Sequence, residues 1–474
     1  MLACVLMGSC LGGNRELSEA DRSAFGTFVN DMDSSLTGKW FTRMGVSSDA
    51  DSLLAYLQRE LPSNGLDTAA FPLTQIAADL QIIHQLAFDS VGQSINEVLP
   101  RLDQALSEAF VTYTTGQRYG FVQPDKLLNR LDFKVGGQGY ARLFDYEVAA
   151  PNREEARRQL SSPDRLAYLY ASQPSGAVYQ ALRQKLAETT DPETREKLAV
   201  NMERCRWQMV QPVETGRRII VNIPALQLWT LGGDSVLNMR VVCGAQLTKT
   251  PLLHSEISHL QVNPEWIIPK NIVDNEVSHH AGDSAYFARN HYYIVDRTSG
   301  DTLSPVKVSA ERLKTGGLRV GQRGGSGNSL GRIVFRFQNN FGVYLHDTNN
   351  RGAFNRDRRT LSHGCVRVQK PFDLACYLLP EIDEWAKDCM RISMDIRPVT
   401  DRGRRYLQEH VDAPRPYRLM TYHDVSPRVP VYIIYYTAYP NPATGVVEYW
   451  PDVYGFDKLI HAELRRTTAH SAVH

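Results

Sequence analysis

Apolar residues in the first part of the chain recur at the spacing of amphipathic helices. In the stretch LTQIAADLQIIHQLAF, Leu73, Ile76 and Leu80 fall three or four residues apart, and LDQALSEAFVTY repeats this spacing. Such a period places apolar side chains on one face of a helix. Asp191, followed by proline in DPETREKLAVNMERCRW, adds a helix start. The pattern therefore predicts a helical domain over residues 15–210.

The pattern changes near residue 211 to one that is typical of β-strands. β-branched and aromatic residues fill the stretches GRRIIVNIPALQLWTL, VLNMRVVCGA, GRIVFRFQNNFGVYLHD and VPVYIIYYTAY. Runs of this kind, bounded by Gly, Pro and Asn, indicate strands. A helical interlude is predicted at 371–390. The sequence thus predicts an α+β fold in which a helical domain precedes a mainly-β domain over residues 211–474.

A polar, Gly-rich passage interrupts the predicted strands between about 270 and 330. It ends with the stretch GGLRVGQRGGSGNSLG. A loop of this length inside a domain is usually a functional lid or a disordered insert. We therefore expect a lid or capping insertion at this point of the β domain.

Composition and charge narrow the classes of function. The 474 residues are 42% hydrophobic and 22% charged, which is ordinary for a globular protein. The 53 Lys and Arg nearly balance the 52 Asp and Glu, so a nucleic-acid partner is not expected. The seven cysteines form no C-x-x-C pair, which removes the usual signature of a zinc ribbon or a thioredoxin-type site.

The N-terminal residues 1–14, MLACVLMGSCLGGN, are apolar and uncharged. They are too few to span a bilayer, which takes about 20 residues. They resemble the end of a secretory signal, and MGSC resembles a lipoprotein cleavage box that would make Cys10 the lipidated residue. Either interpretation predicts export to the periplasm or cell envelope, with a lipid tether to the membrane in the second.

Residues 344–368, YLHDTNNRGAFNRDRRTLSHGCVRV, hold the densest candidate chemistry of the chain. Sixteen residues separate His346 from His363, and Cys365 follows a glycine. A nearby imidazole can take the proton of a thiol, and glycine lets a substrate approach closely. The cysteine could equally be a small buried core residue, which is the usual state of an isolated cysteine. A metal site is less favoured, because no other histidine cluster has ligand spacing.

Strand geometry offers a way to bring these groups together. Tyr344 and His346 are two residues apart, so an extended backbone points both to one face. The same rule groups His363, Cys365 and Arg367 if that segment is extended. Two adjacent strands would then place an imidazole beside the thiol, a set suited to acyl transfer through a thioester.

Two short matches to a serine-enzyme signature are rejected. SPVK at 304–307 fits S-x-x-K, and KTG follows at 314–316. The two lie far too close together for that fold, S-D-N is absent, and SPVKVS alternates like a strand. Serine chemistry is therefore not expected.

The motifs resemble the L,D-transpeptidase catalytic domain of YkuD type, in its large YcbB-like branch. The resemblance rests on His346, on the 16 residues that separate it from His363, and on SHGC at 362–365. Further matches are VNMERCRW, IIVNIPALQLW, NPEWIIP, GQRGGSGNSLG, YLHDT and VPVYIIYYTAY…DVYGFD, over about residues 100–460. The polar residue after the cysteine is Arg367 here, where compact members often have Asn.

The resemblance implies a function and a role for each site residue. It implies an enzyme that joins peptidoglycan stem peptides by 3→3 cross-links, without a cofactor or metal, and that carbapenems acylate. Cys365 is then the nucleophile and His346 its base. Tyr344 and Gly364 then help to shape the oxyanion region, and His363 is a supporting hydrogen-bonding residue of the catalytic group. Arg367 steadies the pocket, and Asn328 of GQRGGSGNSLG lies in the substrate or oxyanion region.

One departure from the family leaves alternatives open. Large members often carry a small peptidoglycan-binding helical module, and no G-D-x-G…V-x-x-L-Q run occurs between 140 and 200. Hydrolysis by an L,D-carboxypeptidase is an alternative within the enzyme class. A non-catalytic envelope protein that binds peptidoglycan is the alternative outside it.

Overall fold

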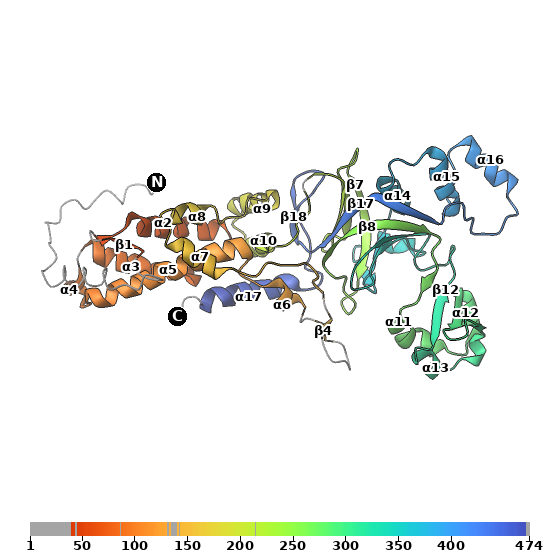
Figure 1. The fold of residues 1–474 in the computed structure, drawn as a ribbon, viewed down its shortest axis with the longest axis horizontal. Helices are drawn as coiled ribbons and strands as arrows, with labels where there is room; N and C mark the ends of the chain where they lie inside the picture. The colour runs from red at the N-terminus through yellow and green to blue at the C-terminus, as the bar shows by residue number, and fades with distance from the viewer. Residues whose placement is uncertain are drawn as a thin grey trace.

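The molecule is elongated, with a helical body at one end and a β domain at the other (Figure 1). The computed structural model describes residues 39–470, apart from 43–44, 86, 130–131, 134–139, 142 and 214. The predicted lipidation site Cys10 and residues 1–14 lie outside the described residues. The predicted α+β class, with helices before strands, is confirmed.

The helical body is built around α5 (Ile95–Tyr119), whose first turn carries a capping box between Ser94 and Glu97. Its apolar stripe, which includes Leu102, Leu106 and Phe110, is fully buried. No helix among the described residues has the length and apolarity that a membrane crossing requires. The other elements are β1 (Phe41–Thr42), β2 (Gly45–Val46), α2 (Ser48–Ser63), η1 (Thr68–Ala70), α3 (Leu73–His84), α4 (Phe88–Val91), α6 (Pro124–Leu128), β3 (Asp132–Phe133), β4 (Tyr140–Ala141), α7 (Arg153–Leu160), α8 (Arg165–Tyr170), α9 (Ala177–Glu188) and α10 (Pro192–Arg206).

The C-terminal helix α17 (Phe456–His470) belongs spatially to the helical body, which differs from the predicted boundary. Figure 1 shows it running back along the helical body, and it packs against α10, α6 and η1. Ile460 and Leu464 are buried there. Arg204 of α10 also reaches Asp457 at 2.6 Å. The chain therefore returns to the helical body after it completes the β domain.

A buried ion pair fixes α10 inside the helical body. Arg206 and Glu203 have fully buried side chains and lie 3.2 Å apart. Arg206 also donates to Gln117 at 2.9 Å, and the amides of Phe121 and Val122 donate to Glu203. Both charges therefore have several partners, which a buried pair requires.

Replacing Arg206 by Met should destabilise the protein strongly. The substitution leaves the Glu203 carboxylate buried without its cation, which costs about 3–5 kcal/mol of unfolding free energy. Urea denaturation followed by tryptophan fluorescence measures the change. Arg157→Met, which removes an exposed pair with Glu154, is the matched control and should change stability little. A variant Arg206→Met as stable as the control would contradict this account.

In the described part of the chain, the largest sheet has nine strands in the order β15-β7-β16-β14-β13-β8-β17-β5-β6. β6 also pairs with β7, so the sheet closes on itself like a barrel. Within this closed sheet, β14 and β16 are neighbouring strands. The strands are β5 (Arg218–Asn222), β6 (Gln227–Leu231), β7 (Leu237–Gly244), β8 (Leu253–Val262), β13 (Ile333–Phe337), β14 (Leu345–His346), β15 (Thr360–Ser362), β16 (Val366–Val368) and β17 (Tyr422–Ile434), followed by the pair β18 (Ala438–Pro440) and β19 (Val447–Tyr449).

The predicted lid or capping insertion is a folded subdomain, and it contains strands that its polar, Gly-rich sequence did not indicate. Residues 266–322, here called the lid subdomain, are all described and hold a four-stranded sheet with its own apolar core. Ile294 and Phe287 lie at the centre of that core. Its elements are β9 (Trp266–Ile267), α11 (Lys270–Asn275), η2 (Val277–His280), α12 (Ser284–Arg289), β10 (Tyr292–Asp296), β11 (Thr302–Leu303), η3 (Pro305–Lys307), α13 (Ala310–Lys314) and β12 (Leu318–Gln322).

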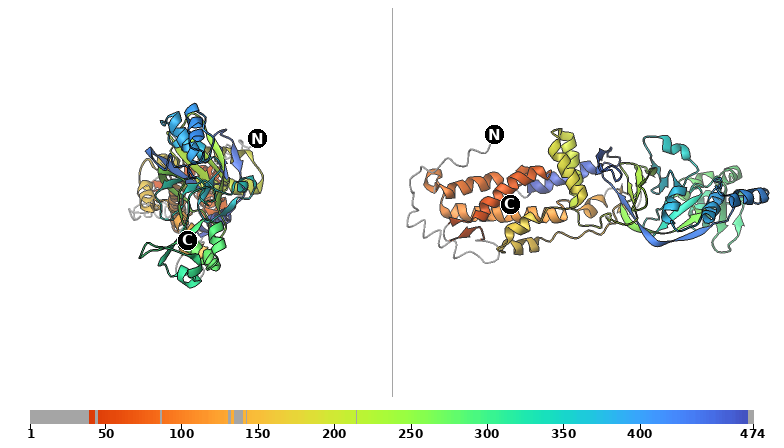
Figure 2. Two further views of the ribbon diagram at one scale, coloured as in Figure 1. Left: turned by 90° about the vertical axis from the view of Figure 1, so that its right-hand side faces the viewer. Right: turned by 90° about the horizontal axis from the view of Figure 1, so that it is seen from above.

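The predicted helical interlude is confirmed and is longer than expected. It comprises α14 (Pro371–Leu378), α15 (Glu384–Ser393) and α16 (Asp401–Glu409). These helices and the lid subdomain occupy the end of the molecule farthest from the helical body, as Figure 1 and the right-hand view of Figure 2 show. The β domain therefore lies between the helical body and these two insertions.

Candidate active site

The two segments that carry the candidate residues are neighbouring parallel strands. Leu345 of β14 pairs with Val366 of β16, and His346 pairs with Arg367. The prediction that these segments are adjacent strands is thus confirmed. Cys365 directly precedes β16 and Tyr344 directly precedes β14, so the same register places these two residues side by side.

The turn that presents the cysteine is pinned by hydrogen bonds. Ser362 Oγ donates to the Cys365 carbonyl at 2.6 Å and accepts from the Gly364 amide at 3.2 Å. Thr250 Oγ1 donates to the Gly364 carbonyl at 2.8 Å. Gly364 has φ +114°, a conformation that L side chains rarely adopt, whereas an added Cβ would meet its nearest atom only at 3.6 Å. Backbone conformation, and not crowding beside the sulfur, therefore requires glycine here.

Because of that glycine, the alternation of an extended strand does not continue through residue 364. β16 begins only at Val366. His363, Cys365 and Arg367 nevertheless line one cavity together with Tyr344 and His346.

This cavity has a volume of about 170 Å³ and is roofed by the lid subdomain. Trp266, Pro269 and Ile272 of the lid lie on one side, and Phe341 and Ser329 of the β domain complete the wall. Sites for drug-sized ligands typically hold about 300–1,000 Å³. A peptide therefore needs the lid to move outward before it can enter.

His346 is buried, with 4% of its surface exposed. Its Nδ1 atom is also buried and has no hydrogen-bond partner. Burial, together with the nearby Arg367 guanidinium, lowers the pKa of the ring to about 3. The side chain is therefore a neutral imidazole, and its unpartnered nitrogen is a buried polar atom that calls for a functional explanation.

Cys365 is partly exposed to the cavity. Burial raises the pKa of its thiol to about 11, although the Tyr344 backbone and the guanidinium groups of Arg336 and Arg367 favour the thiolate. With His346 neutral as well, the closed site holds a neutral thiol and a neutral imidazole. This differs from the expected thiolate, because the lid keeps water from solvating either charge.

Alkylation of Cys365 should therefore be slow at neutral pH when no substrate is bound. The thiolate is the reactive species, so the rate with iodoacetamide should rise with pH up to about 11. Intact mass measured against pH, with the Cys365→Ala variant subtracted, gives the profile. A plateau reached below pH 7 would instead show a resting thiolate–imidazolium pair.

Two arginines and one tyrosine surround the thiol. Arg367 lines the cavity, and its Nε is buried without a hydrogen-bond partner. The Arg336 guanidinium lies 4.4 Å from the centre of the Tyr344 ring, and burial raises the pKa of that tyrosine to about 12. Sequence reasoning missed Arg336, although its position in IVFRF, two residues after Val334, puts it on the same strand face as Val334, which pairs with His346.

His363 contacts the lid. Its Nε2 lies 2.7 Å from Oε1 of Glu276, which lies between α11 and η2. Sequence reasoning also missed Glu276, because no local pattern links it to a residue 87 positions away.

Asn328 lies outside the cavity lining, unlike the role assigned to it from the sequence. Its side chain is fully buried. The amide nitrogen donates to the carbonyls of Pro264 and Arg323, and the amide oxygen accepts from the Leu330 amide. With these partners Asn328 holds the junction between lid and β domain and has no free group for a substrate.

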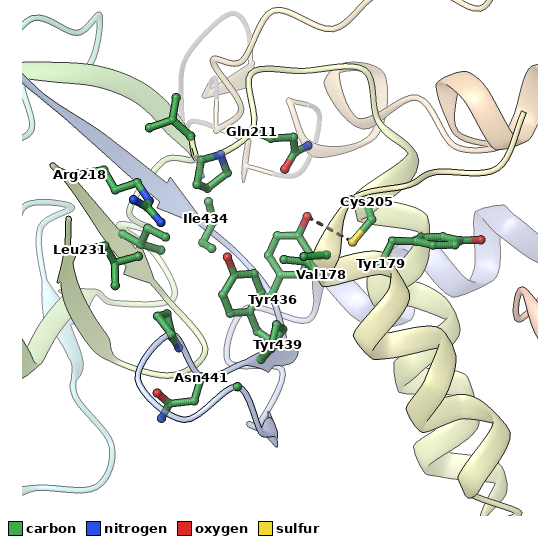
Figure 3. Close-up of a pocket in the computed structure, with 18 of the residues that line it drawn as sticks. Val178, Tyr179, Cys205, Gln211, Arg218, Leu231, Ile434, Tyr436, Tyr439 and Asn441 are labelled. Atoms are coloured by element: carbon green, nitrogen blue, oxygen red, sulfur yellow. Dashed lines mark hydrogen bonds between the residues drawn. The ribbon is translucent and has the colours of Figure 1, made fainter. Parts of the chain in front are cut away.

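A larger cavity, of about 380 Å³, lies between α9 and the β domain (Figure 3). Cys205 is its only sulfur, and Figure 3 shows that atom facing the Tyr436 hydroxyl, to which the thiol donates at 3.9 Å. Burial raises the pKa of Cys205 to about 12, and no histidine lines the cavity. The larger cavity therefore lacks a nucleophile–base pair, and the smaller one is the candidate active site.

The other sequence signals do not assemble into sites. In SPVK, Ser304 is the N-cap of η3 and the other three residues form this short helix, with Val306 exposed. The segment is therefore neither the predicted strand nor the buried helix start of a serine enzyme. His254 and His259 stack on Tyr432 and Tyr422. Across the residues that the structure describes, no three His, Cys, Asp or Glu side chains are grouped as metal ligands.

Comparison with known proteins adds two family matches and one relative. Residues 37–186 match the scaffold domain model, and residues 216–384 match the model of the L,D-transpeptidase catalytic domain, YkuD. A Haemophilus influenzae protein named "Putative L,D-transpeptidase" is 28% identical over 368 residues, which cover 74% of this chain and 69% of that protein. The second match includes β14, the glycine turn and β16.

Proposed function

We propose that this chain, which carries an L,D-transpeptidase catalytic domain of the YkuD family behind a scaffold domain, forms 3→3 peptidoglycan cross-links through an acyl-enzyme on Cys365. Membership of the family implies peptide stems of peptidoglycan as substrates. The acyl-enzyme mechanism is supported by two side chains that line one cavity: the partly exposed thiol of Cys365 and the buried imidazole of His346, whose Nδ1 atom has no hydrogen-bond partner.

In the first step the thiol attacks the carbonyl carbon of residue three of a tetrapeptide stem. The resting pair is neutral, so His346 Nδ1 takes the proton as the sulfur–carbon bond forms, and no free thiolate accumulates. The imidazolium then gives this proton to the departing amine. The carbon–nitrogen bond breaks, D-alanine leaves and a thioester remains on Cys365.

In the second step a neutral amine from the diamino acid of a neighbouring stem attacks the thioester. The new amide bond forms, the sulfur leaves, and a proton from the amine passes through His346 to the thiol. Arg367, whose buried Nε has no partner, is placed to pair with a substrate carboxylate. Tyr344 lines the cavity together with Cys365, and the Arg336 guanidinium lies over its ring.

The same thiol should open the lactam of a carbapenem and retain the ring-opened acyl group. We further propose that the enzyme works in the periplasm or cell envelope, where its substrate lies, and contributes to cell-wall biogenesis. The sequence of residues 1–14 supports export, and a lipid on Cys10 would tether the protein to the membrane.

Muropeptide analysis tests the proposal. Disaccharide-tetrapeptides incubated with the protein should yield dimers linked 3→3 and free D-alanine, identified by chromatography and mass spectrometry. Tripeptides without dimers would show an L,D-carboxypeptidase instead. Unchanged tetrapeptides, together with binding to peptidoglycan, would show a non-catalytic envelope protein.

A further inference from the structure

In the second step of the proposed reaction, the acceptor amine must lose one more proton than the Cys365–His346 pair can accept. A primary amine of the acceptor stem is protonated near neutral pH, since such groups have pKa values of about 8–10. An ammonium has no lone pair and cannot attack. Forming the amide therefore releases two protons: one before the attack and one during it. His346 can hold one of them.

We infer that His363, oriented by Glu276, is the base that takes the first proton from the acceptor ammonium; the inference rests on the proposed function. Five ionisable side chains line the cavity. Cys365 is acylated at this stage, His346 serves the sulfur, Arg367 is a cation, and burial keeps Tyr344 protonated. Of the residues that line the cavity, His363 is the ionisable one left.

The contact with Glu276 sets the tautomer that a base needs. The Nε2 atom of His363 lies 2.7 Å from the Glu276 carboxylate, so Nε2 carries the hydrogen and donates it. Nδ1 is then the nitrogen with a lone pair. The carboxylate also holds the ring in one orientation, as the acid does in an acid–histidine pair. Glu276 is thus a positioning residue.

Exposure gives the proton a way out. The side chain of His363 is 47% exposed, whereas His346 is buried. His363 can therefore pass its proton to bulk water after each transfer, while the proton on His346 returns to the sulfur. His363 therefore takes the proton of the acceptor amine, and His346 exchanges a proton with the sulfur of Cys365.

The pair also ties acceptor activation to the lid. Glu276 belongs to the lid subdomain and His363 to the turn that presents the cysteine. A pair as exposed as this one is weak, so the lid can detach to admit a stem. The base is complete only when the lid has closed again over the acyl-enzyme. Water is a neutral nucleophile and needs no prior deprotonation, so loss of the pair should favour hydrolysis over transfer.

The test compares two acceptors in the variant Glu276→Gln. Transfer to the stem amine at pH 7 should fall about tenfold or more relative to acylation by a carbapenem. Transfer to hydroxylamine, which is neutral at that pH, should change far less. Raising the pH to 10, where the stem amine loses its proton in solution, should restore transfer, and Glu276→Asp should retain part of it. Tripeptide should replace dimer among the products at pH 7.

Two further variants complete the design. His363→Gln should show the same selective loss for the stem amine, and Glu311→Gln, an exposed lid residue outside the cavity, should leave both acceptors unaffected. Equal losses for both acceptors, or a loss that persists at pH 10, would overturn the inference while leaving the proposed function intact. Absence of acylation in the unmodified protein would instead overturn the proposed function.

Discussion

Cys365→Ala is expected to abolish both cross-linking and carbapenem acylation. Removing the atom that forms the thioester leaves no covalent route, and losing a nucleophile typically costs about 10⁴-fold or more in rate. The fold should survive, because the cysteine is partly exposed and hydrogen bonds from Ser362 and Thr250 hold its turn through the backbone.

The rate of dimer formation from tetrapeptides measures this effect. Cys389→Ala is the matched control, because it removes a thiol on α15 that is remote from the cavity, and it should react at the unmodified rate. Activity in Cys365→Ala within tenfold of this control would contradict a role for the thiol.

His346→Gln is expected to lower the rate of acylation by about 10²–10⁴-fold, the usual contribution of general base catalysis. The resting thiol has a pKa of about 11, so without the imidazole almost none of it is ionised at pH 7. The variant should therefore gain rate as the pH rises toward that value, whereas the unmodified protein gains much less.

Stopped-flow fluorescence with a carbapenem at several pH values measures this difference. The thermal midpoint of unfolding serves as the control for folding, since Gln fills a similar volume. A variant that acylates at the unmodified rate at pH 7 would show that His346 is not the base.

The face of Cys365 was not predictable from period-two alternation, because the turn at Gly364 interrupts the alternation before β16 begins. That the two segments are neighbouring strands was predictable, because it depends on short-range pattern: two β-like runs are joined by only 16 residues between His346 and His363. Helices with a long apolar period, such as α3 and α5, were predictable for the same reason.

The partners of the active site that come from distant segments were not predictable. Glu276 reaches His363 only because the lid subdomain folds back over β16, and no local pattern encodes that approach. The insertion was predicted as a lid or capping subdomain, but its strands were not, because some are as short as two residues and glycines separate them. The return of α17 to the helical body likewise depends on tertiary packing.

The protonation states were not predictable either. Sequence reasoning expected an ionised sulfur because an imidazole lies near it. The structure adds burial, which raises the pKa of Cys365 and lowers that of His346. Such shifts depend on how completely the lid excludes water, and sequence spacing carries no information about that.

The sulfur of Cys365 is expected to be acylated by a peptidoglycan stem, and peptide mapping of the trapped intermediate detects this bond. The protein is incubated with disaccharide-tetrapeptide, quenched in acid and digested with trypsin, which releases residues 360–367 as one peptide. This peptide should gain the mass of the stem without its terminal D-alanine. An adduct on any other peptide, or turnover without an adduct here, would contradict this expectation.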